Sequence, residues 1–582
     1  MVITQTNTQQ KQFSAAPRRS THKFRGHAQN VLRVIPLGGV EEVGRNMTLF
    51  EYGNDIIIVD MGLQFPEEDM PGIDYIIPNI SYLRGKEKNI RGIIITHGHY
   101  DHIGGIPHIV NRLGNPTVYT AELTRGIILK RQEDFKELPK LDIEIVKKND
   151  TIELGSFKVT FFHVNHTIPD AMGLAIETPT GLVVHTGDFK FDHSPVADSP
   201  ADLSRISQLA QKGVLLLMSE STDAETPGHS ISEKTIQENL ENIFKDAKGR
   251  IIAVTFSSLL TRIQSIIFLA EKYGRKVAID GYSMKTNVEM AKALNYLKIN
   301  KGTLISISQV NGLDPSKVVV MCTGAQGEDK AVLMRIANHE HRHIRIQKGD
   351  SVIFSSSVVP GNERTVQGLK DTLCRQGAKI FHSLLMDIHA GGHAPQEDLK
   401  MMINLTRPKF FMPIHGNYYM LKLHAELAES VGIPTKNIYI PSNGQVILLN
   451  KEKIWYSREK VPANYVMVDG LGVGDVGQVV LRDRQMMSQD GIFVIIATID
   501  KQNGKVKSSP DIISRGFIYM RESKELLADV RNKVKEIVEE STMAGHPVNW
   551  SYVKDNLRDK IGQFLYTKTE RRPMVIPVVI EV

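Results

Sequence analysis

The stretch THGHYDHIGG, residues 96–105, follows the apolar run RGIII and decides the fold of this chain. His97 and His99 stand two residues apart beyond a predicted strand, and Asp101 and His102 begin the turn that follows. This order places two pairs of nitrogen and oxygen donors on opposite sides of a small volume, which suits two neighbouring divalent cations better than one. A structural zinc site would more often contain cysteine and close itself with four ligands. The stretch therefore predicts a two-metal site at the end of a strand.

Two metal ions need more ligands, and polar residues at the ends of other apolar runs supply candidates. Asp60 follows DIIIV, His166 lies in NHTIPD, Asp188 lies in HTGDF, and His415 lies in PIHGN. Such runs of aliphatic and β-branched residues predict strands, and the loops at strand ends are where sites are usually built. An aspartate after an apolar run is commonplace, so Asp60 by itself carries less weight than the histidines.

Length and composition exclude several classes of protein. The 582 residues exceed what one hydrophobic core holds, and the hydrophobic (41%) and charged (23%) fractions are ordinary for a globular protein. The two cysteines, Cys322 and Cys374, are too few for a disulfide framework, and no CxxC pair is present. No apolar stretch approaches the roughly 18 residues that span a bilayer, and no signal-like apolar core opens the chain. These features predict a multidomain cytoplasmic protein without a membrane segment.

The positive charge is confined to one end of the chain. The net charge is +6, and residues 1–40 contain six Lys and Arg and no Asp or Glu, so residues 41–582 are neutral overall. A basic body that binds nucleic acid through a global field is therefore excluded. Residues 1–28 contain almost no aliphatic side chains, and we expect a disordered basic arm there, which is either a contact for polyanions or a solvated tail.

Apolar periodicity and glycine-rich turns divide this α/β chain into several units. Short strand-like runs come first, and an insert that alternates strands and helices follows, as in a parallel sheet covered on both faces. The run VGQVVLRD is expected to open the last domain as a strand. The expected boundaries are 29–215 and 396–450 for the two parts of the first domain, 216–395 for the insert, 451–475 for a linker and 476–582 for a C-terminal α/β domain.

The ordered set of polar strand ends resembles the metallo-β-lactamase fold, an αββα sandwich. This resemblance implies a ligand for each position of two metal sites. His97, His99 and His166 would hold one ion, Asp101, His102 and His415 the other, Asp188 would bridge the two, and Asp60 would orient ligand imidazoles by accepting their spare N–H. The ions are expected to be zinc, with manganese or magnesium as alternatives.

Further segments resemble a narrower group of enzymes. Glu220 in LMSEST, His393 in IHAGGHAPQED and the insert before His415 are similar to the β-CASP subgroup of nucleic-acid nucleases. Segments such as PLGGVEEVGRNM, CTGAQGED, SSSVVPGNE, VDGLGVGDVGQVVLRDR and PDIISRGF are similar to bacterial ribonuclease J. The resemblance implies a metal-dependent nuclease that cuts single-stranded RNA from the 5′ end and internally during RNA maturation and decay. It also implies a homodimer or homotetramer and contacts with other RNA-decay proteins.

The resemblance implies a catalytic group as well. Two neighbouring cations would lower the pKa of a shared water and clamp the phosphate, and the leaving 3′-oxygen would then need a proton. His393 is the candidate general acid, with Glu220 keeping it charged and Asp188 completing the catalytic set. Without the resemblance, His393 would be interpreted as a loop histidine bonded to backbone.

Several positions depart from the pattern of the ribonuclease J family. Tyr100 stands where the family usually has glutamate, and Tyr282 stands where it usually has arginine. Gly391 replaces a serine that is expected to bind phosphate, and the family's Asn-x-His-Arg is reduced here to Arg262. The residues expected to contact RNA or phosphate are Ser355, Ser356, Ser357, His389, Gly391, Gly392 and Arg262. The metal set is thus complete, whereas segments of the RNA channel and the 5′-end pocket are altered.

Two alternative functions stay open at the level of sequence. One is a β-CASP nuclease that prefers DNA, which a comparison of RNA and DNA of one sequence would distinguish because only 2′-OH contacts separate them. The other is a non-catalytic RNA-binding paralogue, suggested by the altered channel residues. The intact set of seven ligands argues against loss of catalysis.

Overall fold

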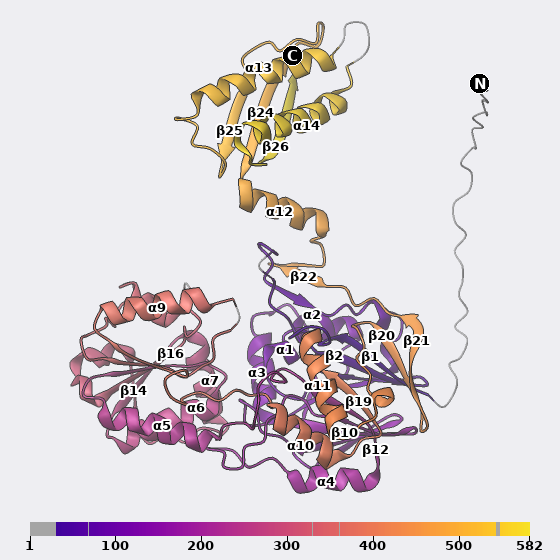
Figure 1. Ribbon diagram of the computed structural model, residues 1–582, viewed down its shortest axis with the longest axis vertical. Coiled ribbons are helices and arrows are strands. Elements are labelled where there is room, and N and C mark those ends of the chain that lie inside the picture. The colour runs from indigo at the N-terminus through magenta and orange to yellow at the C-terminus, as the bar shows by residue number, and fades with distance from the viewer. Residues whose placement is uncertain (1–30, 68, 329, 360, 543–547) are drawn as a thin grey trace.

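The computed structural model describes residues 31–67, 69–328, 330–359, 361–542 and 548–582. The basic arm expected over residues 1–28 lies outside the described residues. Figure 1 shows three units in this part of the chain: a two-sheet domain at the lower right, an inserted domain at the lower left and a small C-terminal domain above them.

Two sheets form the first domain. Over the described residues, one has eight strands in the order β21-β20-β1-β2-β3-β5-β6-β7, and the other has six in the order β19-β12-β11-β10-β9-β8. The strands of the first sheet are β21 (Ile454–Lys460), β20 (Gln445–Leu449), β1 (Leu32–Gly38), β2 (Met47–Tyr52), β3 (Asp55–Val59), β5 (Ile90–Ile94), β6 (Val118–Thr120) and β7 (Ile143–Ile145). Those of the second are β19 (Phe410–Ile414), β12 (Val214–Glu220), β11 (Gly181–His185), β10 (Met172–Thr178), β9 (Phe157–His163) and β8 (Thr151–Leu154).

The core between these sheets consists of aliphatic and aromatic side chains from both. Phe50 and Ile57 from the first sheet and Phe161 and Leu174 from the second belong to one buried cluster. Successive side chains of a strand point to opposite faces, so the alternate residues of β3 face the outer side of the sheet. Each such fully buried side chain contributes about 1.5–3 kcal/mol relative to an exposed one.

Helices cover the two outer faces of the sandwich. Ile103, Ile106 and Ile128 pack on the first sheet, and Leu209 and Met402 pack on the second. The helices on the first sheet are α1 (Tyr100–Ile103), α2 (Ile106–Ile109) and α3 (Glu122–Gln132). Those on the second are α4 (Leu203–Lys212), α10 (Gln396–Thr406) and α11 (Tyr418–Ser430). The expected αββα sandwich is confirmed.

The inserted domain is built on a parallel sheet in the order β15-β14-β16-β13-β17-β18. Its strands are β15 (Leu304–Ile305), β14 (Lys276–Asp280), β16 (Val318–Cys322), β13 (Ile251–Val254), β17 (Ser351–Phe354) and β18 (Lys379–His382). Its helices are α5 (Glu233–Asp246), α6 (Leu260–Lys272), α7 (Tyr282–Ala293), α8 (Val332–Ala337) and α9 (Glu363–Arg375). Ile236 and Ile263 pack on one face and Leu333 and Leu369 on the other, so both faces are covered as expected. The first of these clusters continues into the first domain, which joins the two bodies through one core.

The segment expected to be a linker, residues 451–475, is largely structured. Strand β21 pairs with β20, with Trp455 opposite Leu448. Strand β22 (Val466–Asp469) pairs with β23 (Gly472–Val473) and with β4 (Tyr75–Ile77) of the first domain. The structure differs from the expectation because β22 pairs with β4, almost 400 residues earlier in the chain, which local composition does not report.

The C-terminal domain has a three-stranded sheet with two long helices on one face. Its elements are β24 (Ile492–Ile499), β25 (Asp511–Arg515), β26 (Met574–Glu581), α13 (Lys524–Ser541) and α14 (Trp550–Thr569). Within the described parts of the chain, no helix combines the length and apolar character needed to cross a membrane.

The strand expected over VGQVVLRD is wrong, because α12 (Gln478–Asp490) occupies this place. In Figure 1 this helix joins the C-terminal domain to the rest of the chain. Leu481 packs against Ile73 and Met467 of the segments below it, whereas Val479 and Val480 are exposed. A short apolar run fits either a strand or a helix, and here the contact of one leucine favours the helix.

Candidate metal centre

The predicted ligands lie beyond the carboxyl ends of strands in both sheets of the sandwich. Asp60 directly follows β3 and His415 directly follows β19, while His166 and Asp188 each stand three residues after β9 and β11. The stretch with His97 follows β5. All seven residues predicted to ligate metal come together in two neighbouring groups, as this placement leads one to expect.

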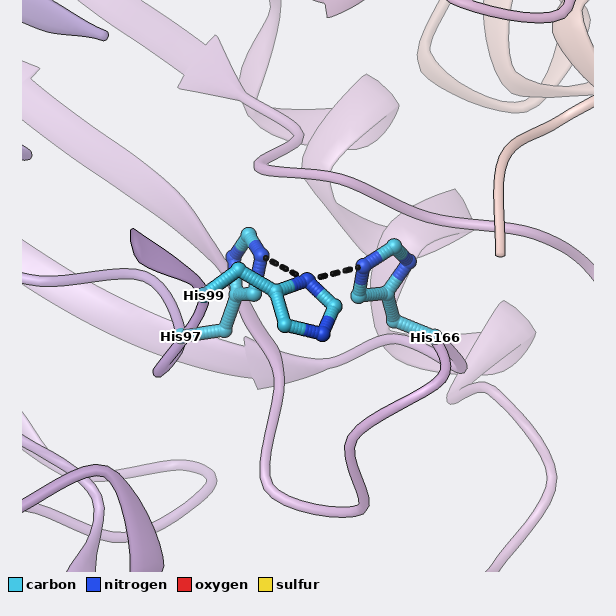
Figure 2. A group of neighbouring side chains, drawn as sticks. All are labelled: His97, His99 and His166. Atoms are coloured by element: carbon cyan, nitrogen blue, oxygen red, sulfur yellow. Dashed lines mark hydrogen bonds between the residues drawn. The ribbon is translucent and has the colours of Figure 1, made fainter. Parts of the chain in front are cut away.

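The first group consists of His97, His99 and His166. In Figure 2 the Nδ1 atom of His99 lies between the Nε2 atoms of His97 and His166, at 3.1 Å and 3.0 Å. The Nδ1 atom of His166 donates to the carbonyl oxygen of Gly392 at 2.6 Å, so its Nε2 carries a lone pair that faces the group. Burial lowers the pKa of all three rings, that of His99 to about 4. Neutral imidazoles with converging nitrogens are the form that binds a metal ion.

The second group consists of Asp101, His102, Asp188 and His415. The Nδ1 atom of His415 donates to Asp188 Oδ1 at 2.8 Å, and His102 Nε2 lies 3.2 Å from Asp188 Oδ2. The Oδ2 atom of Asp101 lies 3.3 Å from His415 Nε2 and 3.5 Å from His102 Nε2. One ligand atom from each of the four residues lies within 4.8 Å of the others. Two carboxylates and two imidazoles thus form a mixed oxygen and nitrogen site.

Asp188 faces both groups. Its Oδ2 atom lies 3.7 Å from His97 Nε2 and 3.9 Å from His166 Nε2, in addition to its contacts in the second group. Although burial opposes ionisation, His415 and His102 hold the pKa of Asp188 well below its usual range. The ionised carboxylate therefore stands between the two groups, where a bridging ligand would stand.

Asp60 and His415 have backbone conformations that non-glycine residues rarely adopt. Their φ angles are 61° and 49°. Asp60 is 2% exposed, and its carboxylate accepts hydrogen bonds from the Thr96 N–H at 2.8 Å, from the Thr96 hydroxyl and from His102 Nδ1 at 2.8 Å. Left-handed conformations of this kind cost about 1–3 kcal/mol and persist where the surroundings over-determine them. Here they aim two side chains at the same small volume.

His393 approaches the groups from the loop between β18 and α10. Its Nδ1 atom lies 3.3 Å from Glu220 Oε2 and 3.8 Å from Asp188 Oδ2. Burial alone would lower the pKa of His393, but Glu220, Asp188 and Asp223 outweigh it and raise the pKa to about 10. Glu220 itself is buried and accepts hydrogen bonds from the backbone N–H of Thr222 at 2.9 Å and of Ala394 at 3.2 Å.

The donor set fits divalent cations. The Nε2 atom of His415 is buried and makes no hydrogen bond of good alignment within the described residues. Buried polar atoms without partners are costly, and a cation is the partner that imidazole nitrogens beside carboxylates would accept. With no thiolate in either group, the nitrogen and oxygen ligands suit zinc and also manganese.

Family models match almost all of the described chain. The Metallo-beta-lactamase superfamily matches residues 40–248, and the beta-CASP domain of Ribonuclease J matches residues 248–373. The Zn-dependent metallo-hydrolase RNA specificity domain matches residues 386–441, and the Ribonuclease J C-terminal domain matches residues 479–582.

Curated relatives cover the chain nearly from end to end. Ribonuclease J 1 of Streptococcus pyogenes serotype M3 is 41% identical over 95% of this chain and 98% of its own length. Ribonuclease J2 of Bacillus subtilis is 38% identical over 96% of this chain and 99% of its own length. The chain belongs to the ribonuclease J family. A solved structure from Enterococcus faecalis, described as a protein of unknown function, shares the fold with a TM-score of 0.53 and 18% identity over 72% of this chain and 100% of its own.

One residue that the family resemblance placed on phosphate lies elsewhere. Arg262 is fully buried and forms an ion pair with Glu233 at 2.9 Å. Its guanidinium also donates to the hydroxyl of Ser355 and to the carbonyl oxygen of Ile388 at 2.7 Å. Lys190 of the first domain lies 3.3 Å from the same glutamate. The expectation that Arg262 contacts phosphate is corrected, because the side chain is fully buried and its two terminal nitrogens donate to protein groups.

The neighbouring polar residues that were expected to bind RNA or phosphate are also mostly buried. Ser355 is buried, and its hydroxyl donates to the carbonyl oxygen of Ile388 at 2.6 Å. Its hydroxyl is therefore occupied by a contact within the protein. Ser356 is buried, whereas Ser357 is exposed. His389 is partly buried, and burial together with Arg262 lowers its pKa to about 3. Of this set only Ser357 presents a hydroxyl to solvent.

The two glycines before His393 have different surroundings. Gly391 is exposed, so its backbone N–H stays a candidate for binding an anion. Gly392 is buried, and a Cβ atom added to it would lie 2.6 Å from the ring of His166. Gly392 therefore allows the chain to pass closely behind His166, a proposed ligand.

Sequence reasoning missed two residues that hold the predicted ligands in place. Thr96 binds Asp60 and lies 3.1 Å from His97 Nδ1. The Nδ2 atom of Asn46 lies 3.2 Å from His102 Nε2 and donates to the backbone carbonyl oxygen of Asp101 at 3.2 Å. Both lie in segments that carry the family resemblance, and attention to every polar residue in those segments would have found them.

Proposed function

We propose that this chain is a metal-dependent ribonuclease that hydrolyses phosphodiester bonds of single-stranded RNA. The observation that carries the proposal is the pair of ligand groups that share Asp188, in a chain of the ribonuclease J family. The match to an RNA specificity domain supports RNA over DNA as the substrate.

The proposed ligand roles follow the two groups. His97, His99 and His166 would hold one ion, Asp101, His102 and His415 the other, and Asp188 would contact both. When bound, the two cations supply a water of lowered pKa and positive charge for the phosphate oxygens. Zinc is the proposed metal, supported by the imidazole-rich donor set and by the zinc-dependent domain model. Manganese and magnesium are the alternatives that a metal titration compares.

His393 is the proposed general acid. Its Nδ1 atom lies near two carboxylates, those of Glu220 and Asp188, which favours a positively charged ring near neutral pH. An imidazolium in this position can give a proton to the leaving 3′-oxygen, which would otherwise depart as a costly alkoxide. The backbone N–H groups that bind Glu220 keep its carboxylate in place.

The finer activity is also a proposal: 5′-to-3′ exonucleolytic and internal cleavage during RNA maturation and decay, in the cytoplasm and alongside other RNA-decay proteins. A time course with 3′-labelled single-stranded RNA carrying a 5′-monophosphate, 5′-triphosphate or 5′-hydroxyl, with zinc, manganese or magnesium, tests it. Mononucleotides indicate exonucleolysis and internal fragments indicate endonucleolysis. Absence of hydrolysis with every metal, or full activity of His97→Ala, would contradict the proposal. DNA of the same sequence serves as the comparison.

We also propose that the C-terminal domain contributes to a homodimer or homotetramer. Its sheet buries one face under α13 and α14, and the other face carries partly exposed apolar side chains of β24 and β26. Ile513, Ile576, Val578 and Ile580 are 39–45% exposed on this face. A second copy of the same sheet is the occupant with matching chemistry, and sedimentation of Ile513→Lys against the wild type tests it.

A further inference from the structure

The loop between β18 and α10, which carries His393, is held by a different domain at each of its ends. Near its start, the carbonyl oxygen of Ile388 accepts a hydrogen bond from Arg262 of the inserted domain at 2.7 Å. Near its end, the carbonyl oxygen of Gly392 accepts a hydrogen bond from His166 of the first domain at 2.6 Å. The position of His393 therefore depends on how the two domains are placed relative to each other.

The inserted domain holds Ile388 with two donors that also bind each other. The guanidinium of Arg262 donates to the carbonyl oxygen of Ile388 and to the hydroxyl of Ser355, and that hydroxyl donates to the same carbonyl oxygen. All three residues are fully buried. Arg262 lies in the first turn of α6 and Ser355 directly follows β17. Because both donors belong to regular elements packed in a core, they fix this end of the loop.

A buried group of charges joins these donors to the first domain. The Nη2 atom of Arg262 lies 3.2 and 2.9 Å from the two carboxylate oxygens of Glu233, the first residue of α5. Lys190 of the first domain lies 3.3 Å from the same carboxylate and is 2% exposed. The backbone N–H of Glu233 also donates to Asp192 of the first domain at 2.8 Å. Lys190 stands two residues after Asp188, which faces both ligand groups.

These buried charges favour one placement of the two domains. A buried charge that loses its partner is strongly destabilising, so a shift that separates Lys190 from Glu233 is opposed. Hydrogen bonds from a charged guanidinium are short and directional, so the contact of Arg262 with the loop is also fixed. Such precision matters for a catalytic group, because a misplacement of about 1 Å can lower the rate by about 100-fold.

We propose that Arg262 and Glu233 are positioning residues for His393. Glu233 fixes the inserted domain on the first domain through Lys190, and Arg262 holds the loop of His393 through Ile388. The inference rests on the proposed function, because His393 is the group proposed to act on the leaving 3′-oxygen. In hydrolysis a water oxygen bonds to phosphorus, the bond to the 3′-oxygen breaks, and the proton of His393 goes to that oxygen. A displaced loop impairs the last of these events.

The first measurement is hydrogen–deuterium exchange of the full chain in EDTA, which requires no activity. Ser355→Ala removes one donor to Ile388 and leaves the ion pair in place, so the variant should fold. We expect residues 388–394 to exchange about threefold faster or more, as loss of one hydrogen bond predicts. Ser265→Ala is the matched control, because Ser265 is buried in α6 and its hydroxyl donates within that helix, to Thr261 at 3.1 Å.

The second measurement compares the hydrolysis of two single-stranded RNAs that differ at one linkage, where sulfur replaces the leaving 3′-oxygen. A thiolate departs without a proton, because thiols are far more acidic than alcohols. We expect Ser355→Ala, Arg262→Met and Glu233→Gln to lower kcat about tenfold or more at the oxygen linkage and to lose little at the sulfur linkage. His393→Ala should show the same rescue by sulfur.

Arg250→Met is the matched control for the buried arginine. Arg250 precedes β13 and pairs with Asp350 at 2.6 Å, at the opposite end of the same sheet, and both side chains are buried. This variant should lose stability as Arg262→Met does, but should cleave both linkages like the wild type. Its melting temperature, measured beside that of Arg262→Met, separates loss of stability from loss of positioning.

The outcomes separate the positioning role from the proposed function. Equal losses of Ser355→Ala and Arg262→Met at both linkages overturn the positioning role, as do exchange and cleavage rates that match the two controls. A defect of His393→Ala that sulfur does not rescue contradicts the proposed general acid. If the wild type cleaves neither linkage, the proposed nuclease is contradicted, and loop exchange in Ser355→Ala then decides whether the inserted domain holds the loop.

Discussion

The Nδ1 atom of His102 donates a hydrogen bond to Oδ2 of Asp60 at 2.8 Å, which settles which nitrogen of His102 faces the metal centre. With the proton on Nδ1, the lone pair on Nε2 points toward Asp101 and Asp188. Asp60 is in turn held by Thr96 and has the left-handed conformation of a strained residue. One carboxylate therefore sets both the tautomer and the orientation of a proposed ligand.

Replacing Asp60 tests this relationship. We expect Asp60→Asn to lower metal affinity or RNA hydrolysis about 10- to 100-fold, because the ring of His102 loses the charge that orders it. Asp55→Asn is the matched control, since Asp55 begins the same strand at its other end and binds Arg91 and Ser156. Equal activities of the two variants in a metal titration would contradict the role of Asp60.

Metal content should follow the two groups of ligands. Elemental analysis should find two divalent ions per wild-type chain and about one in either His97→Ala or His415→Ala, because each substitution removes a ligand from one group only. Removal of the ions with EDTA should abolish hydrolysis, and adding zinc or manganese should restore it. His229→Ala, which alters a histidine bonded to Asp398 away from both groups, should keep two ions. A wild type that binds no ion would refute the two-metal centre.

The close passage of Gly392 behind His166 predicts a loss of activity from a single methyl group. The added Cβ of Gly392→Ala would lie 2.6 Å from the ring of His166 and would displace that ring or the His393 loop. We expect hydrolysis to fall at least tenfold while the melting temperature changes little. Gly368→Ala, where the structure leaves open space in α9, should retain full activity. Comparable rates of RNA hydrolysis for both variants would show that the chain accommodates a methyl group at residue 392 without displacing His166.

The buried pair of Glu233 and Arg262 predicts a pH-dependent contribution to stability. Although burial opposes ionisation, Arg262 and Lys190 lower the pKa of Glu233 to about 2 from its usual 4.5. Below pH 4.5 the unfolded chain binds a proton that the folded chain does not, so this stabilisation is lost progressively as pH falls from about 5 to 2. Glu233→Gln should therefore unfold more easily at pH 7, by about 3–5 kcal/mol, and the difference from wild type should shrink at acid pH.

Denaturant unfolding at several pH values measures this difference. Glu241→Gln is the control, because Glu241 pairs with Lys272 on an exposed surface and should contribute little. A difference between Glu233→Gln and wild type that stays constant from pH 7 to pH 3 would contradict the assignment.

Arg262 should contribute to stability and not to RNA binding. Arg262→Met removes a buried ion pair and should lower stability, but it should leave the salt dependence of RNA affinity unchanged, because its guanidinium does not reach solvent. Binding isotherms at several salt concentrations, together with thermal unfolding, separate the two effects. If Arg262→Met reduces the slope of log K for RNA binding against log salt, Arg262 contacts phosphate after all.

Part of the candidate metal centre is visible in the printed residues because four of its proposed ligands are close in sequence. His97, His99, Asp101 and His102 lie within six residues, and the apolar run before them predicts a strand that delivers them together. Asp60, His166, Asp188 and His415 follow strands of the same kind, and strand ends meet at one rim of a sandwich. The spacing of polar residues after apolar runs therefore indicated the candidate ligands, whereas the fold and the role of each residue came from the resemblance to a known family.

Contacts between distant segments decided the rest. Arg262 looks like a phosphate ligand in the sequence, but Glu233 from α5 and the carbonyl oxygen of Ile388 surround it in the fold. The helix α12 and the strand β22 depend in the same way on partners far along the chain. Tyr100 and Tyr282 share a cavity only because the inserted domain lies beside the first. The local pattern of polar and apolar residues indicates which face of a strand or helix a side chain occupies. Its burial and its pairing depend on which remote segment packs against that face.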